Sequence, residues 1–468
     1  MGKIMITCVY LLVIALLARQ MAFEKRINMD ERTSLGSTMF AGSSVSFSSA
    51  KPGKGGLILS PKSSVPRTFK PPKVFQDIYD NMDSEDAEER CKRYGFTYES
   101  SPKRRIFFGA LIADEPLDAA RLHAAEAYDL YHTVAFVESN ATFINTPRDI
   151  RYLPGTAANK ELSSGIFGKN ADVFVDFWYE APHEKDAMVR EGVQRHMIGQ
   201  RWKAQGMRRD DIGIVADLDE LFTRDFMLAL QSCDYPPLMK EKKCKAPKYA
   251  ANTLNFEALP SCMSMKRLNH PDLMMGECTE GIGDPTDRVV ALREFKREFG
   301  NREIAFGLHP KRSGPFYSDV LKKFERYPLW GTQDYREVLG TIPLNVGEKF
   351  TAFHLHNFFD DMKTVRHKYA TYGHGTGEIE NVTLSRISAS LDLTVRCVHG
   401  LGNYGVDNPR HRQRTLREPS PDLPVPVYFQ DESYVKRRFE QVRDFVLEDE
   451  QIYGSGYEEV LRQQGKAS

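Results

Sequence analysis

Residues 210–222 read DDIGIVADLDELF, an apolar run that ends in carboxylates. The stretch over 212–216 has the composition of a buried β-strand. Asp217, Asp219 and Glu220 follow it directly. Unpaired charges at the end of a buried strand are unfavourable, so another group must compensate them. A divalent cation is the first candidate, because Mn²⁺ and Mg²⁺ prefer oxygen ligands.

The segments that precede this motif predict an α/β fold. Strand-like runs alternate with helically spaced apolar residues, as in proteins whose parallel strands are joined by helices. We therefore expect a mainly parallel sheet flanked by helices, with a ligand site beyond the carboxyl ends of the strands, where the acidic motif falls. The expected strands are 104–114, 133–139, 171–180 and 210–220, and the expected helices are 117–128 and 185–206.

A second group of polar side chains lies in residues 350–374, FTAFHLHNFFDDMKTVRHKYATYGH. His354 and His356 are two residues apart, so on a strand they would share one face. One of them would complete a metal shell or contact a phosphate group. Lys368 and His374 add basic groups downstream. This segment is the expected partner of the acidic motif.

The amino-terminal part of the sequence differs from the rest. Residues 4–18 are apolar and carry no charge, which predicts a signal peptide or signal anchor over 1–22 and targeting to the secretory pathway. Residues 32–76 carry no acidic residue and are rich in Ser, Pro and Gly. Such a composition is typical of a tether, so we expect a flexible basic stem over 23–100.

The cysteine usage fits an oxidising compartment. Cys8 lies in the apolar run, and the other six cysteines form an even set. Cys233 with Cys244, and Cys262 with Cys278, are close enough in sequence for short-loop disulfides. The spacing alone does not choose among the alternative pairings.

Several classes of function are not supported by the sequence. Basic and acidic residues number 64 each, so no net charge favours nucleic acid. No phosphate-binding Gly-x-x-x-x-Gly-Lys-Ser/Thr loop and no Gly-x-Ser-x-Gly nucleophile elbow occurs. One rival is a haloacid-dehalogenase-type phosphatase, which also places Asp-x-Asp after an apolar strand. That class has Thr or Val two residues after the second Asp, where this chain has Leu221.

With these residues in view, the chain resembles glycosyltransferase family 17, the family of β-1,4-mannosyl-glycoprotein β-1,4-N-acetylglucosaminyltransferases. The resemblance covers roughly 105–374 and consists of three blocks in order. The strongest is VREGVQRHMIGQRWKAQGMRRDDIGIVADLDEL over 189–221. The others are VAFVESNATFINTPRDI over 134–150 and FHLHNFF over 353–359.

The resemblance implies a role for each matching residue. Asp217 and Asp219 would hold Mn²⁺ or Mg²⁺, with Glu220 beside them and His354 as a third metal ligand. Asp217, Asp219 and Glu220 are thus the expected catalytic group. Residues expected to line or support the pocket for a UDP-sugar are Glu138, Arg148, Glu191, Arg195 and Lys368.

Two of these points have alternatives. Glu191 and Arg195 are four residues apart on the expected helix, so an ion pair that orders the helix is as well supported as substrate contact. The family's chemistry is inverting, so one carboxylate must accept the proton of the acceptor hydroxyl. Further candidates for that base are Glu277, Asp284 and Asp287.

The resemblance also implies an organisation and a location. We expect a GT-A-like domain over 104–376 and a helical or irregular extension over 377–468. The expected activity is transfer of N-acetylglucosamine from a UDP-sugar to a protein-linked N-glycan. The expected location is the Golgi membrane, with a lumenal catalytic domain anchored through 1–22, or alternatively the secreted fraction. A second hypothesis is a non-catalytic, secreted glycan-binding protein.

Overall fold

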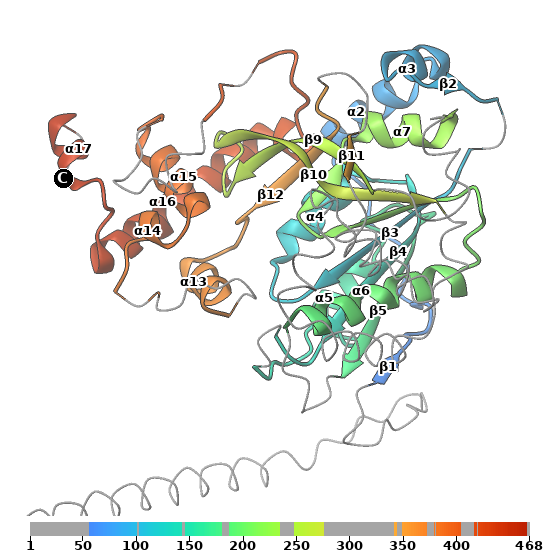
Figure 1. Ribbon diagram of the computed structural model, residues 1–468, viewed down its shortest axis with the longest axis horizontal. Helices are drawn as coiled ribbons and strands as arrows, with labels where there is room; N and C mark the ends of the chain where they lie inside the picture. The colour runs from blue at the N-terminus through green and yellow to red at the C-terminus, as the bar shows by residue number, and fades with distance from the viewer. Residues whose placement is uncertain are drawn as a thin grey trace, which may run out of the picture. The chain divides into compact units, whose positions relative to one another are not determined.

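The structure is a computed structural model, and the part of the chain that it describes contains one large sheet with helices around it (Figure 1). The described residues are 56–100, 103–142, 146–179, 187–234, 248–275, 341–343, 349–371, 379, 381–403, 416–418 and 420–465. The expected amino-terminal segment 1–22 lies outside them. Within the described residues, no helix combines the length and the apolar character needed to cross a membrane.

The centre of the sheet is parallel, as the sequence predicts. Its four strands lie in the order β5, β4, β3, β6 and all run the same way. All seven residues of β3 are buried, which explains why this strand is a continuous apolar run and does not alternate. The strands are β3 (Ile106–Ile112), β4 (Tyr131–Ser139), β5 (Asp172–Tyr179) and β6 (Ile212–Asp217).

Beyond β6 the sheet becomes mixed, so the expectation of a mainly parallel sheet holds only for its central part. The long strand β10 pairs antiparallel with both β6 and β9, and β12 pairs parallel with β9 but antiparallel with β7. A short strand, β1, closes the opposite edge antiparallel to β5. These elements are β1 (Gly56–Ile58), β7 (Glu220–Phe222), β9 (Lys248–Glu257), β10 (Met263–Met275), β11 (Thr341–Pro343) and β12 (Ala352–His356).

Helices that connect the parallel strands pack on them. Helix α6 (Ala187–Ala204) contacts β3 and β4 (Figure 1). Its Trp202 is fully buried and donates from Nε1 to Phe108 O at 3.1 Å. A Cβ added at Gly109 would lie only 2.0 Å from Ile198 Cγ2, so α6 can approach β3 this closely because residue 109 is glycine. The other helices that connect the parallel strands are α4 (Leu117–Glu126) and α5 (Ala157–Ser163), while α7 (Arg224–Ser232) follows β7.

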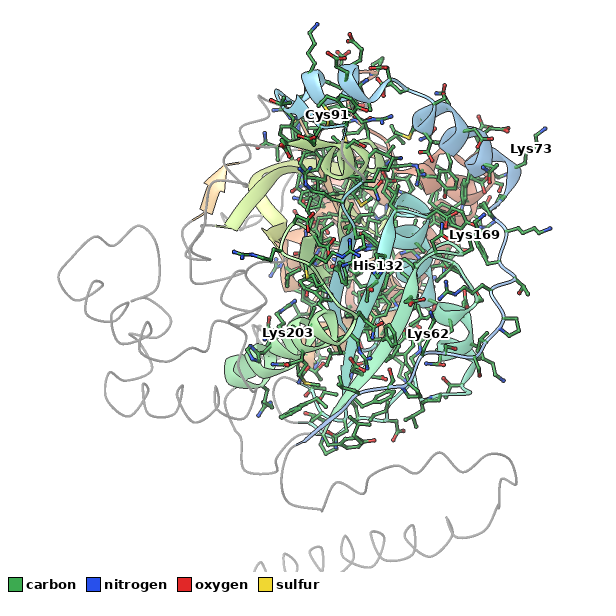
Figure 2. All side chains as sticks on the ribbon, turned by 90° about the vertical axis from the view of Figure 1, so that its right-hand side faces the viewer. Lys62, Lys73, Cys91, His132, Lys169 and Lys203 are labelled. Carbon is green, nitrogen blue, oxygen red and sulfur yellow. A yellow bond between two sulfur atoms is a disulfide. The ribbon has the colours of Figure 1, made fainter. Side chains whose placement is uncertain are left out.

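The expectation of a flexible stem over 23–100 is wrong for residues 56–100. This segment forms two helices, and a disulfide joins Cys91 to Cys233 at the end of α7 (Cys91 is labelled in Figure 2). Phe75 and Tyr79, one turn apart on the first helix, are both buried. The apolar periodicity of this helix therefore outweighs the stem-like composition that precedes it. The elements are α2 (Lys73–Asp83), α3 (Ala87–Arg93), β2 (Thr97–Tyr98) and β8 (Cys233–Asp234).

The disulfides are long-range, and neither of the short-loop pairs that the spacing allows is formed. Cys233 pairs with Cys91, and Cys262 pairs with Cys397, across 142 and 135 residues. All four sulfurs belong to segments that pack together in the folded chain, which sequence distance does not reveal. Cys8, Cys244 and Cys278 lie outside the described residues.

The carboxy-terminal helices, orange to red in Figure 1, build a second hydrophobic core against the end of β9. Leu259 and Cys262 are fully buried in this core together with residues of α15 and α16. Arg438 of α16 is also buried and donates to the carbonyls of Ala258 and Phe359. These elements are α13 (Met362–Thr371), α14 (Leu384–Ile387), α15 (Ala389–His399), η2 (Val427–Gln430), α16 (Glu432–Tyr453) and α17 (Glu458–Gln463).

Candidate active site

The acidic motif forms a tight turn between two strands. β6 ends at Asp217 and β7 begins at Glu220, so Leu218 and Asp219 make the turn. The Asp217 N–H donates to Glu220 Oε2 at 2.9 Å, and the Leu355 N–H donates to Asp219 O at 2.7 Å. Leu218 is buried, whereas the Asp217 side chain is 39% exposed. The turn therefore presents Asp217 outward on a backbone that is fixed from both sides.

His354 lies beside this turn, as expected for a third member of the site. It is the register partner of Glu220 in the pairing of β12 with β7. Its Nε2 is 3.5 Å from Asp219 Oδ2. Burial disfavours the ionised Asp219, but attraction to His354, their hydrogen bond and the charge of Lys368 outweigh it and lower the pKa of Asp219 to about 2. The same carboxylate raises the pKa of His354 against the effect of burial.

His356 shares a face of β12 with His354, which confirms the expected geometry of the pair. The two ring centroids are 5.1 Å apart. His356 Nδ1 lies 2.8 Å from Oε2 of Glu257, a carboxyl that is fully buried at the end of β9. Burial lowers the pKa of His356 although Glu257 opposes this shift. A neutral imidazole oriented by a buried carboxylate is thus placed next to the acidic turn.

Arg195 connects helix α6 to the acidic turn. Its guanidinium bonds Glu191 Oε1 at 3.0 Å, Asp217 Oδ1 at 2.5 Å and the carbonyl of Ala216 at 3.3 Å. Arg195 is only 2% exposed. The ion pair with Glu191 that the helical spacing allows is therefore present, and the same guanidinium also holds one of the two aspartates.

Lys368 adds positive charge to the site from α13. Its Nζ lies 4.9 Å from the centroid of the Phe359 ring. The charge of Lys368 lowers the pKa of Asp219 and contributes to the lowered pKa of His356. Lys368 is thus close enough to influence both groups.

Glu138 and Arg148 organise the neighbouring strand ends. Both carboxylate oxygens of Glu138 accept backbone N–H groups, from Arg151 at 2.7 Å and Tyr152 at 2.9 Å. Burial raises the pKa of Glu138, although these two hydrogen bonds oppose the shift. Arg148 donates from Nε to the carbonyl of Ser139, the last residue of β4, at 2.7 Å. Both residues therefore shape the loop at the edge where Asp217 lies, and Glu138 is only 1% exposed.

Two buried residues at the site were not expected from the sequence, namely Glu257, described above, and His123. His123 of α4 is fully buried, with Nδ1 at 2.8 Å from the carbonyl of Leu218 and Nε2 at 2.9 Å from the hydroxyl of Tyr131. Burial lowers its pKa to about 4, so the ring is neutral. His123 therefore bonds the backbone of Leu218, the residue between Asp217 and Asp219. Its only sequence signal is a polar residue on the apolar side of an expected helix.

Asp217, Asp219 and His354 belong to residue types that can bind a divalent cation. Two carboxylates and an imidazole are ligands that Mn²⁺ accepts. Asp219 and His354 are adjacent, while Asp217 is engaged by Arg195. In the described part of the chain, no three His, Cys, Asp or Glu side chains stand close enough to form a metal cluster. Of the other sequence candidates, Glu277, Asp284, Asp287 and His374 lie outside the described residues.

Parallel strands flanked by helices, with an Asp-x-Asp turn at a strand end, are consistent with a GT-A-like glycosyltransferase domain. Residues 65–246 match the family model described as Glycosyltransferase family 17. This match, which covers part of the chain, confirms the resemblance to that family. It includes the acidic turn and Arg195, whereas His354 and Lys368 lie beyond its end. The search of curated proteins gave no match.

Proposed function

We propose that the protein is a metal-dependent, inverting glycosyltransferase that moves N-acetylglucosamine from UDP-N-acetylglucosamine to a protein-linked N-glycan. The family match supports glycosyltransferase activity. The observation that carries the finer proposal is the acidic turn itself. Asp219 lies 3.5 Å from His354, and Asp217 is held at 2.5 Å by Arg195.

Asp217, Asp219 and His354 are the residues that would hold Mn²⁺ or Mg²⁺. When bound there, the cation supplies positive charge for the diphosphate of the UDP-sugar. Arg195 orients Asp217 from α6, and the Leu355 N–H fixes the backbone of Asp219. The low pKa of Asp219 keeps this carboxylate ionised at neutral pH.

The remaining residues have supporting parts in the proposal. Lys368 adds positive charge on the side of α13, where a diphosphate leaving group gains negative charge as its bond to the sugar breaks. Glu138 and Arg148 fix the loop after β4, which would form the nucleotide-sugar end of the pocket. Glu191 acts through Arg195 and not by direct contact with substrate.

Glu220 is better suited to a positioning role than to proton transfer. In an inverting transfer, the acceptor oxygen bonds to the anomeric carbon while the bond to UDP breaks, and a base takes the acceptor proton. Glu220 is 4% exposed, and its Oε2 accepts the Asp217 N–H. A carboxylate engaged in this way holds the turn and does not meet an acceptor hydroxyl.

We also propose that the domain works in the lumen of the Golgi, anchored by residues 1–22, with secretion as the alternative. Two disulfides between distant parts of the chain support an oxidising compartment. The acceptor would then be a glycoprotein N-glycan.

The test is a binding and turnover screen of UDP-sugars with and without Mn²⁺. We expect Mn²⁺-dependent binding of UDP-N-acetylglucosamine and its slow hydrolysis in the absence of an acceptor. Asp217→Asn and Asp219→Asn should abolish transfer and leave the fold intact. Wild-type rates in either variant would contradict the proposal. Absence of donor binding would favour the glycan-binding alternative, and release of phosphate from an aryl phosphate would favour the phosphatase.

A further inference from the structure

A cavity of about 200 Å³ lies on the outer side of α4, with no lining residue in common with the acidic turn. Its walls come from three parts of the chain: the amino-terminal segment, the helices α4 and α5, and η2. Five of the lining side chains are aromatic, namely Phe69, Phe75, Tyr79, Tyr128 and Tyr428. This concentration of rings around one small cavity calls for a physical explanation.

The rings are held in place by one another and by the backbone. Tyr79 and Tyr128 are stacked with centroids 5.4 Å apart and planes 3° from parallel. The Tyr79 hydroxyl donates to the carbonyl of Ala125 at 2.7 Å. Phe69 lies 6.2 Å from Tyr128, and Phe75 lies 5.0 Å from Tyr428. These contacts preform the apolar wall, so a ligand would not have to order it.

The rest of the lining includes a charged pair. Arg121 donates to Glu161 at 2.5 Å and to Asp118 at 2.6 Å. The Arg121 and Glu161 side chains are 42% and 26% exposed, so both are accessible to a ligand as well as to each other. The cavity therefore combines aromatic side chains with a charged donor and a charged acceptor.

We propose that this cavity is an accessory carbohydrate-binding site that takes one pyranose ring of a glycan. A pyranose has a face of C–H groups, which packs on the electron-rich face of an aromatic ring, and an edge of hydroxyls, which bond charged groups strongly. The cavity has both kinds of group: Phe69, which is 38% exposed, provides an accessible ring, and the Arg121–Glu161 pair provides the charged groups. Its volume lies below the roughly 300–1,000 Å³ of sites for drug-sized ligands, and it suits a single ring.

The role of this site rests on the proposed function: it would hold a distal sugar of the acceptor glycan while another sugar reacts at the acidic turn. Helix α4 links the two places, because Tyr128 follows its end while His123 bonds the carbonyl of Leu218 within the turn. A purely apolar ligand is less well matched, since it would shield the partly exposed Arg121–Glu161 pair from water without offering it a hydrogen bond.

The test is saturation-transfer NMR of the full chain with N-acetylglucosamine, mannose and galactose, and with cyclohexanol as an apolar ring of similar size. We expect at least one sugar to bind. Tyr128→Ala should weaken that binding about tenfold, and Glu161→Gln should weaken it several-fold. Tyr98→Ala removes a tyrosine that is 43% exposed and outside the cavity, so it should have no effect. If Tyr128→Ala does not fold, the sugar binding measured with Glu161→Gln tests the assignment of the cavity.

Two further arms separate this site from the reaction centre. Asp217→Asn with Asp219→Asn, and saturating UDP with Mn²⁺, should leave sugar binding at the cavity unchanged. Sugar binding without any transfer would contradict the proposed function and support the cavity assignment. The assignment is overturned if only cyclohexanol binds, if no sugar binds, if UDP displaces the sugar, or if both cavity variants bind like wild type.

Discussion

Arg195 Nη2 lies 2.5 Å from Asp217 Oδ1, and the same guanidinium bonds Glu191 one helical turn before it. Helix α6 is thus tied to the carboxyl end of β6 through a side chain that is only 2% exposed. The two carboxylates compensate the charge of the buried guanidinium, and the ion pair fixes the direction of Asp217. We regard Arg195 as a positioning residue that acts through Asp217.

Replacing Arg195 by Met should impair transfer more than stability. The variant leaves Glu191 and Asp217 without this partner, which we expect to reduce the free energy of unfolding by about 2 kcal/mol. Misplacement of Asp217 should lower kcat by about 100-fold and shift the Mn²⁺ concentration for half-maximal activity. Arg195→Lys should recover part of the rate, because it restores the charge but not the forked geometry.

Arg105→Met is the matched control. Arg105 bonds Asp211 at 3.0 and 2.5 Å, at the opposite end of β3 and β6 from the acidic turn. It should lower stability by a similar amount without changing the dependence on Mn²⁺. Equal Mn²⁺ profiles for Arg195→Met and wild type would show that Arg195 is purely structural.

His123→Ala should destabilise the acidic turn, because it removes the buried partner of the Leu218 carbonyl. It leaves the carbonyl of Leu218 and the hydroxyl of Tyr131 without their buried partner, so we expect a loss of roughly 3 kcal/mol in urea unfolding. The KM for the UDP-sugar should rise in parallel. His132→Ala removes a half-buried histidine on β4 whose Nδ1 contacts the hydroxyl of its neighbour Thr133 and whose Nε2 lies 3.4 Å from Arg105 Nη1. It should leave KM unchanged. An unchanged KM in both variants would remove His123 from the site.

The strands and helices near the acidic turn could be predicted because their signals are local. The expected helix 185–206 is observed as Ala187–Ala204, and the expected strand 210–220 ends in the observed turn. The i, i+4 spacing also indicates the Glu191–Arg195 pair. The local sequence pattern is therefore sufficient to predict a strand or helix where the apolar periodicity agrees with the burial.

Other parts of the site depend on contacts between distant segments. His354 reaches Asp219 because β12 pairs with β7, and no periodicity in the sequence specifies that pairing. Resemblance to the family placed His354 in the site, but it did not indicate His123 or Glu257. Both are buried polar groups whose partners are set by packing. The disulfides also depend on the packing of distant segments, since Cys91 and Cys233 are 142 residues apart in the sequence.

The disulfide connectivity gives a direct prediction. Non-reducing peptide mapping should find Cys91 linked to Cys233 and Cys262 linked to Cys397. Removing the second pair by Cys262→Ser with Cys397→Ser should reduce the free energy of unfolding by about 3–5 kcal/mol, because the bond closes a long loop in the unfolded chain. Recovery of Cys262 in a peptide with Cys278 would contradict the connectivity.

Glu126 should make the stability of the protein depend on pH. It is 3% exposed on α4, and its two carboxylate oxygens accept the N–H groups of Arg224 at 2.6 Å and Val427 at 2.9 Å. It therefore joins α4 to α7 and to η2. Burial raises its pKa to about 7, although both hydrogen bonds and the charge of Arg224 oppose this shift.

The direction of this pH dependence follows from the protons that Glu126 binds in the folded and in the unfolded chain. In the unfolded chain this carboxyl loses its proton near pH 4, whereas in the folded chain it keeps the proton until about pH 7. The folded state therefore binds more protons between these values, and the stability contributed by Glu126 is greatest below about pH 4 and falls as the pH rises to 7. Between pH 5 and pH 8 the fall should be roughly 2–3 kcal/mol.

Urea unfolding of wild type and Glu126→Gln at pH 5 and pH 8 measures this fall in the free energy of unfolding. The Gln variant should lose a constant amount of stability, because its amide cannot accept both N–H groups. Its free energy of unfolding should lack the pH dependence that Glu126 causes. Glu459→Gln, whose native side chain is 64% exposed, should show no such difference from wild type. If the difference between wild type and Glu126→Gln is the same at pH 5 and pH 8, Glu126 does not titrate in this range.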